Sequence, residues 1–382
     1  MGEWKEYKFS DFANINPPVK LINGERYSFI EMKDLSDGQK YCFPSVERKL
    51  TGGSRFREGD TLFARITPCL ENGKICQVRG LKDDLGFGST EFFVFRGKAG
   101  ISDNDFVFYL SRWNEVRSFA EMNFDGTSGR QRVPKDAFNN LILALPDLPE
   151  QKSIAAILSS LDDKIDLLHR QNKTLEALAE TLFRQWFVAE EEGWEEKGID
   201  EIAEFLNGLA CQKYPPVAGK ENLPVIKIKE LRLGITEATD MATAEVPEQY
   251  IVNNGDILFS WSGSLEVVIW SHGKGVLNQH LFKVNSDHYP EWFFYFWIKH
   301  HLPEFRNIAQ DKATTMGHIQ RHHLSEAIVV IPEPDKMKNF DAQIKPMFEK
   351  VKRNLTQIRT LTRLRDTILP KLMSGEVRVE MP

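Results

Sequence analysis

Apolar side chains recur at alternating steps of four and three residues along two long stretches of the chain. The first series comprises Ile154, Leu158, Leu161, Ile165, Leu168, Asn172, Leu175, Ala179, Leu182 and Trp186. The second comprises Phe340, Ile344, Met347, Val351, Asn354, Ile358, Leu361, Arg365, Ile368 and Leu372, each 186 residues after its counterpart. This spacing is that of the a and d positions of a coiled coil, so we predict two long helices that pair.

An antiparallel arrangement lets the two series face each other along their whole length. If Asn172 faces Asn354, the register closes without overhang and sets Trp186 opposite Phe340. A buried asparagine pair disfavours shifted registers, because a shift would bury each amide without a partner. The alternative interpretation is that each helix only covers its own globular unit.

One position of this seam is charged. Arg365 falls opposite Leu161, toward one end of the helix pair. A long side chain at such a place can extend its charge into water, and this is what we expect of Arg365.

The segments before the helices repeat each other. GDTLF at residues 59–63 recurs as GDILF at 255–259, and LILALP at 141–146 recurs as AIVVIP at 327–332. Residues 103–119 are predicted to form one aromatic-rich helix, and an aromatic helix is also predicted in the second copy. The chain is thus expected to be α+β, with two similar α/β domains separated by two long helices in an antiparallel coiled coil, and a pseudo-twofold internal repeat. The predicted segments are 1–145, 146–190, 191–331 and 332–382.

Composition restricts the function further. The net charge of −6 argues against a uniformly basic nucleic-acid coat, but not against a local DNA-binding surface. The four cysteines lack the spacing of a zinc site, and no stretch reaches the roughly 18 apolar residues of a membrane span. With no secretory signal at the N-terminus, we expect a cytoplasmic protein.

Polar and basic loop segments are the candidates for DNA contact, because arginine and lysine bind phosphates and polar side chains read base edges. In the first copy the candidates are Arg55, Arg57, Arg65, Lys74, Ser128, Arg130 and Arg132. In the second copy they are Ser260, Ser262, Lys274, Asn278, Gln279, Lys312, Thr314 and His318.

Catalytic signatures are not evident. His318 and His322 have helical spacing, but the adjacent glutamate of a zinc-protease motif is missing, and we expect no metal. Residues 16–19, NPPV, lack the aromatic residue that would stack on a flipped adenine. No glycine-rich nucleotide loop is found, so no catalytic residue and no cofactor are expected in this chain.

Three further segments carry a family resemblance. They are LPEQKSIAAIL at 148–158, LDDKI at 161–165 and the closing LRDTILPKLMSGEV at 364–377. With the duplicated plan, they make the whole chain resemble the specificity subunit of type I restriction–modification enzymes.

This resemblance implies that each α/β domain is a target-recognition domain, and that the two together read a bipartite, non-palindromic double-stranded DNA site. It implies that the helices set the gap between the halves and dock two methyltransferase subunits. S-adenosylmethionine would belong to those subunits, and ATP and Mg to motor-nuclease subunits. Two alternatives remain from the residues alone, namely a coiled-coil adaptor without DNA specificity and a metal-dependent nuclease that uses the histidines near His318.

Overall fold

The computed structural model describes residues 3–127, 129–189, 193–311 and 317–379. The chain forms two compact units, one of Met1–Leu167 with Thr360–Pro382 and one of Leu168–Arg359. Both long helices cross the division between the units. In the described part of the chain, no helix is both long and apolar enough to cross a membrane.

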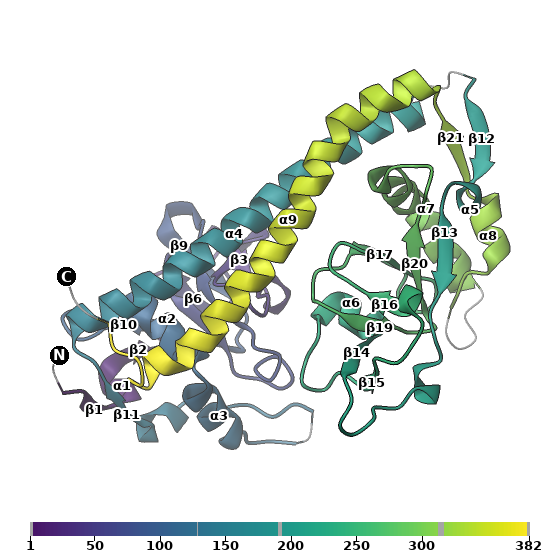
Figure 1. The fold of residues 1–382 in the computed structure, drawn as a ribbon. Helices are drawn as coiled ribbons and strands as arrows, with labels where there is room; N and C mark the ends of the chain where they lie inside the picture. The colour runs from purple at the N-terminus through teal and green to yellow at the C-terminus, as the bar shows by residue number, and fades with distance from the viewer. Residues whose placement is uncertain (1–2, 128, 190–192, 312–316, 380–382) are drawn as a thin grey trace. The chain divides into compact units, whose positions relative to one another are not determined.

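The two long helices are present as predicted. They are α4 (Leu148–Arg184), which continues into a π-helical turn at Gln185–Ala189, and α9 (Pro334–Met373). In each unit a segment of α4, teal in Figure 1, packs against a segment of α9, drawn in yellow-green to yellow.

Contacts within the second unit confirm the predicted register. Asn354 donates from Nδ2 to Oδ1 of Asn172 at 2.7 Å. The rings of Trp186 and Phe340 stack with their centroids 4.2 Å apart. In the first unit, Ile154 and Leu372 belong to one buried apolar cluster. The helices therefore form an antiparallel seam and also contribute to the core of each unit.

The expectation for Arg365 is wrong. Its side chain is 2% exposed, and Nη1 donates to Oδ1 of Asp162 and to the carbonyl of Gly38, both at 2.6 Å. Asp162 lies beside the seam on α4, also 2% exposed, and supplies the countercharge. The charge is kept inside the protein because a carboxylate and a carbonyl are already placed to receive it.

The first unit contains a five-stranded sheet in the order β2 (Ala13–Ile15), β10 (Phe92–Gly97), β7 (Thr61–Ala64), β8 (Ile75–Val78) and β4 (Tyr41–Cys42). A four-stranded sheet has the order β5 (Val46–Lys49), β3 (Arg26–Ile30), β9 (Leu85–Gly88) and β6 (Ser54–Arg57). Strand β1 (Lys5–Lys8) pairs with β11 (Ile142–Leu145). The short helices are α1 (Phe9–Phe12), α2 (Asn104–Arg112), α3 (Asn114–Met122), η1 (Met32–Asp34), η2 (Lys82–Asp84) and η3 (Ala137–Asn140).

The helix predicted over 103–119 is two helices. Asp103 caps the first by accepting from the backbone N–H of Phe106 at 3.0 Å. Trp113 then takes an extended conformation, with ψ at 139°, and separates α2 from α3. The apolar spacing carries on through the break, so it does not reveal the interruption.

The second unit repeats this plan. Its main sheet has the order β13 (Glu204–Asn207), β20 (Leu281–Asn285), β17 (Ile257–Ser260) and β18 (Val267–Ile269). A second sheet has the order β15 (Met241–Thr243), β14 (Asn222–Ile226), β19 (Gly275–Leu277) and β16 (Ile251–Val252), while β12 (Glu195–Gly198) pairs with β21 (Ile328–Ile331). The helices are α5 (Ile199–Ile202), α6 (Ile228–Leu233), α7 (Glu291–Asp311), α8 (Arg321–Glu326), η5 (Cys211–Lys213) and η6 (Glu248–Tyr250).

The repeated Gly-Asp pairs start equivalent strands. Gly59 has φ of 81°, a conformation that glycine adopts without strain, and Asp60 is bonded by the guanidinium of Arg96 at 2.6 Å. In the second unit Gly255 has φ of 96°, and Asp256 pairs with a lysine of the adjacent strand. In each unit the glycine turns the chain and the aspartate ties the strand to its neighbour.

Candidate nucleic-acid interface

The central strand β7 of the first unit leads into Arg65, whose backbone is held on both sides. Its N–H donates to the carbonyl of Glu91 at 3.0 Å, and its carbonyl accepts from Val133 at 2.8 Å. Ile66 forms an antiparallel bridge with Arg132. The guanidinium of Arg132 donates to the Glu91 carboxylate at 2.9–3.0 Å. Two arginines and one glutamate are thereby gathered at the end of the strand.

The equivalent strand β17 of the second unit leads into Trp261. Its N–H donates to the carbonyl of His280 at 3.4 Å, and its carbonyl accepts from Ile319 at 3.0 Å. Ser262 forms an antiparallel bridge with His318. These backbone connections match those of the first unit, so Trp261, His280 and His318 occupy the places held there by Arg65, Glu91 and Arg132.

A pocket of about 440 Å³ opens beside Arg65 in the first unit. Arg55 and Lys135 also line it, and none of its described lining residues is acidic. The guanidinium carbon of Arg65 lies 5.0 Å from the ring centroid of Phe93. Burial lowers the pKa of Arg65, Glu91 raises it, and Arg132 lowers it further. The pocket thus concentrates positive charge in a chain that is acidic overall.

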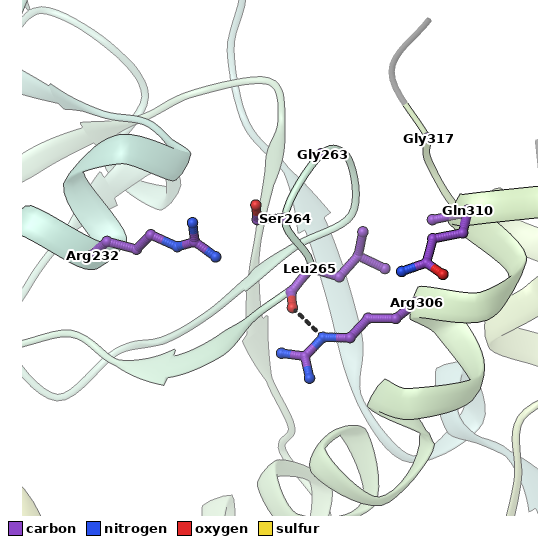
Figure 2. A pocket seen from close by; sticks show the side chains of 8 residues that line it. Arg232, Gly263, Ser264, Leu265, Arg306, Gln310 and Gly317 are labelled. Atoms are coloured by element: carbon purple, nitrogen blue, oxygen red, sulfur yellow. Dashed lines mark hydrogen bonds between the residues drawn. The ribbon is translucent and has the colours of Figure 1, made fainter. Parts of the chain in front are cut away.

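Figure 2 shows a pocket of about 330 Å³ in the second unit. Arg232 approaches it from α6 and Arg306 from α7, on either side of a loop that carries Ser264 and Leu265. Nε of Arg306 donates to the carbonyl of Leu265 at 3.1 Å. Arg232 is bonded to the carboxylate of Glu266, which raises the pKa of Arg232. One of the two cations here is therefore already neutralised.

The remaining candidates of the first unit differ in whether their side chains are exposed or bonded within the fold. Arg57 and Arg130 are exposed. The ammonium of Lys74 donates to the carbonyl of Met32 at 2.7 Å, which fixes it within the fold. Ser128 lies outside the described residues. The structure thus brings Arg55, Arg65 and Arg132 close to one place.

In the second unit several candidates support the loops themselves. Ser260 is buried and donates to the carbonyl of Ser264 at 2.7 Å. Asn278 is buried and accepts from the N–H of His280 at 3.3 Å. Ser262 Oγ lies 3.1 Å from Nδ1 of the same histidine, and Gln279 Nε2 lies 3.4 Å from its Nε2.

Lys274, a further candidate of the second unit, is exposed just before β19. Lys312 and Thr314 lie outside the described residues. Lys135, Arg232 and Arg306 were not among the sequence-based candidates, because each lies outside the polar loop segments from which those candidates were drawn.

Within the described ranges, one side-chain group could hold a metal ion. The ligand atoms of His322, His323 and Glu326 lie within 4.8 Å of one another. However, Nδ1 of His323 accepts from the backbone N–H of Gln320 at 2.8 Å. A neutral ring bonded in this way carries its proton on Nε2, so His323 could bind a metal only by giving up this bond. His318 is not part of the group.

Comparison with known proteins gives a consistent family. The model of the type I restriction modification DNA specificity domain matches residues 1–177 and again residues 191–364. The HindI specificity subunit of Haemophilus influenzae is 24% identical, with 99% of this chain and 100% of the relative covered. The MjaIX specificity subunit of Methanocaldococcus jannaschii is 25% identical, with 72% of this chain and 70% of the relative covered.

A solved structure shares the fold. The type I restriction–modification S subunit from M. genitalium matches with a TM-score of 0.55 at 14% identity, covering 99% of this chain and 97% of that one. The duplicated α+β units and the long antiparallel helix pair define a two-repeat recognition scaffold. The chain belongs to the family of type I restriction–modification DNA specificity proteins.

Proposed function

We propose that this chain is the DNA sequence-recognition subunit of a type I restriction–modification complex, and that each unit reads one half of a bipartite site. The observation that carries this proposal is the double match to the specificity domain. The same pattern of backbone hydrogen bonds after β7 and after β17 supports it. Loops on a retained frame can diverge in chemistry while their placement is preserved.

The two halves of the site should differ in sequence. An arginine can grip the O6 and N7 atoms of guanine with two hydrogen bonds, whereas tryptophan and histidine offer stacking and single hydrogen bonds. The first unit presents Arg65 and Arg132 where the second presents Trp261 and His318. Two surfaces so different in charge and shape favour a non-palindromic target.

The DNA-contacting residues follow from exposure and grouping. In the first unit we assign contact to Arg55, Arg57, Arg65, Arg130 and Arg132. In the second we assign it to Lys274, Gln279 and His318. Lys74, Ser260, Ser262 and Asn278 are assigned a supporting role, since their polar groups bond within the fold. Ser128, Lys312 and Thr314 stay sequence-based predictions.

The long helices are proposed to dock two methyltransferase subunits and to fix the gap between the half-sites. The family match supports this. Ile157, Leu167, Leu178 and Leu364 on these helices are 38–50% exposed, but only a contiguous apolar patch would by itself mark a partner site. Methylation with S-adenosylmethionine would be carried out by those subunits, and ATP- and Mg-dependent steps by motor-nuclease subunits, with no catalytic step on this chain.

The test is methylation by the reconstituted complex. The purified chain is mixed with its methyltransferase partner and S-adenosylmethionine, and modified adenines are mapped on genomic DNA. The expected result is methylation at one split motif with two unlike halves. Methylation without a sequence preference would indicate an adaptor, and metal-dependent cleavage by the chain alone would indicate a nuclease.

A further inference from the structure

We propose that the pocket lined by Arg55, Arg65 and Lys135 binds a phosphodiester group of the DNA backbone and anchors the first unit on its half-site. The inference rests on the proposed function and adds a ligand chemistry and one residue, Lys135, to it. The three cations come from strand β6, from the end of β7 and from the segment after Val133.

Among the described residues, the cations of this pocket lack countercharge. Nearby arginines of the same unit are paired, Arg96 with Asp60 and Arg132 with Glu91. Arg55 and Lys135 form no ion pair with any residue that the structure describes. Three cations around one cavity repel one another, and an anion in the cavity relieves that repulsion.

Arg65 carries a hydrogen-bond donor that the described fold does not satisfy. Its Nε–H is buried and has no hydrogen-bond partner within the described part of the chain. A buried donor without an acceptor costs about 1–3 kcal/mol. The backbone contacts to Glu91 and Val133 hold the residue in place, and its guanidinium lies against Phe93. Arg65 lines the pocket, so its guanidinium can donate to a phosphate oxygen there.

The remaining wall of the pocket is partly apolar. It includes Pro17 and Pro18, which present apolar surface beside the cations, whereas Phe92 and Val94 also line it but are almost fully buried. A phosphodiester in DNA carries one negative charge between two deoxyribose rings, which are largely apolar. An uncharged base edge would leave the three cations uncompensated. The combination of charge and apolar surface therefore fits backbone rather than base.

The second unit does not repeat this site. Trp261 stands at the place of Arg65, and its indole N–H donates to Asn207 and to the carbonyl of Gln279 at 3.1 and 3.2 Å. A neutral ring with a satisfied donor cannot replace a guanidinium as a phosphate ligand. The phosphate anchor at this position is therefore specific to the first unit.

The experiment measures duplex binding by the full-length chain at a series of salt concentrations, using fluorescence anisotropy. The variants are Lys135→Gln, Arg65→Gln and the two combined, with Arg65→Lys as the charge-preserving variant. Lys82→Gln is the matched control, because Lys82 is exposed in the same unit, pairs with Glu47 at 3.3 Å and does not line the pocket.

Each phosphate contact contributes about 0.9 to the slope of log K against log salt. An about tenfold lowering of the salt concentration, down to 0.1 M, therefore raises the affinity about eightfold for each contact. The double variant should lose about this much of the slope and of the affinity. Lys135→Gln should lose a part of both. Arg65→Lys and Lys82→Gln should change both little. Lys135 is exposed, so its variant reports on binding even if Arg65→Gln fails to fold. A wild-type slope in Lys135→Gln and in a folded double variant would overturn the phosphate site while leaving the proposed function intact.

A second arm separates DNA from free phosphate compounds. Inorganic phosphate and ATP are titrated into the wild-type chain by calorimetry. Weak or absent binding of both supports a backbone site. Tight ATP binding that the double variant loses, with duplex binding unchanged, would assign the pocket to a free nucleotide and overturn the proposal. A wild-type chain that binds no duplex at all would count against the proposed function as well.

Discussion

Asn354 donates both amide hydrogens to α4, one to Oδ1 of Asn172 at 2.7 Å and one to Oε1 of Gln171 at 2.9 Å. Asn354 is fully buried and Asn172 nearly so. Nδ2 of Asn172 and Oδ1 of Asn354 have no partner among the residues described. The pair therefore leaves part of its hydrogen-bonding capacity unused, which is consistent with a role in register rather than in stability.

Replacing Asn172 with Leu should lower the unfolding free energy by about 1–3 kcal/mol, because the Asn354 amide loses its buried acceptor. Replacing both asparagines with leucine should restore the loss or more, since no polar group is then buried unpaired. A double-mutant cycle from urea unfolding measures the coupling.

Register is then checked by disulfide trapping between cysteines placed at Leu175 and Val351, which face each other in the predicted register. The double leucine variant should trap less efficiently than the parent with the same cysteines, because its helices can slip. If trapping is equally efficient, the asparagine pair does not specify register.

The buried pair Asp162–Arg365 has an apolar counterpart in the repeat. The residues 186 positions away are Phe348 and Ala179, both buried in the core of the second unit. Tyr109 donates to Asp162 at 2.7 Å, whereas Tyr295, its equivalent, packs on Phe348 with ring centroids 5.3 Å apart. One scaffold thus accepts either a hydrogen-bonded ion pair or an apolar contact at the same place.

Changing Arg365 to Met should therefore cost about 3–5 kcal/mol, because it leaves the Asp162 carboxylate buried without its cation. The double change Asp162→Phe with Arg365→Ala introduces the apolar residues found at the equivalent positions of the second unit. It should lower the unfolding free energy less than Arg365→Met alone. Urea unfolding of the three proteins provides the test. A double variant that is less stable than Arg365→Met would show that the ion pair is needed for more than mutual compensation.

The helix pair could be predicted because its heptad spacing and its asparagines are visible along the chain. Asp162 could not be identified as the partner of Arg365, since it lies outside the a and d series, and only the folded packing brings it to the guanidinium.

Only part of the pocket of the first unit could be predicted from the sequence. Arg55 and Arg65 stood out in basic or strand-end segments, but Lys135 joins them only through the three-dimensional arrangement of distant segments. The break at Trp113 is a backbone feature that side-chain spacing does not encode.

His272 should make the second unit sensitive to mild acid. Burial lowers the pKa of His272, and repulsion from Arg359 adds to the effect. A depressed pKa in the folded state means that the contribution to stability is present above the unfolded-state pKa of about 6.5 and is lost as the pH falls below it.

The unfolding free energy should therefore fall between pH 7.5 and pH 5.5, and His272→Gln should reduce that fall. His288→Gln, at an exposed position, is the control and should leave the pH dependence as it is. Urea unfolding across this pH range measures the unfolding free energy of both variants. An unchanged pH dependence in His272→Gln would exclude this histidine as the source of the acid sensitivity.

Lengthening both helices should lengthen the gap between the two recognised half-sites. Duplicating residues 165–171 in α4 and residues 355–361 in α9 keeps the seam in register, because these heptads face each other. Seven residues add about 10 Å of helix, which corresponds to roughly three base pairs. Mapping of methylated adenines measures the gap. An unchanged gap would contradict the proposal that the helices set it, and a heptad added to α4 alone should disturb folding instead.

The equivalent positions of the two units should control opposite halves of the target. Arg132→Ala removes a cation from the first unit, and His318→Gln removes an imidazole from the equivalent place in the second, while the backbone bridges that define both places remain. Methylation of a duplex library randomised at both half-sites should show relaxed base preference in one half for Arg132→Ala and in the other half for His318→Gln. Because each side chain belongs to a separate compact unit, the two effects should add in the double variant. Relaxation of both halves by either single change would mean that the units do not read DNA separately.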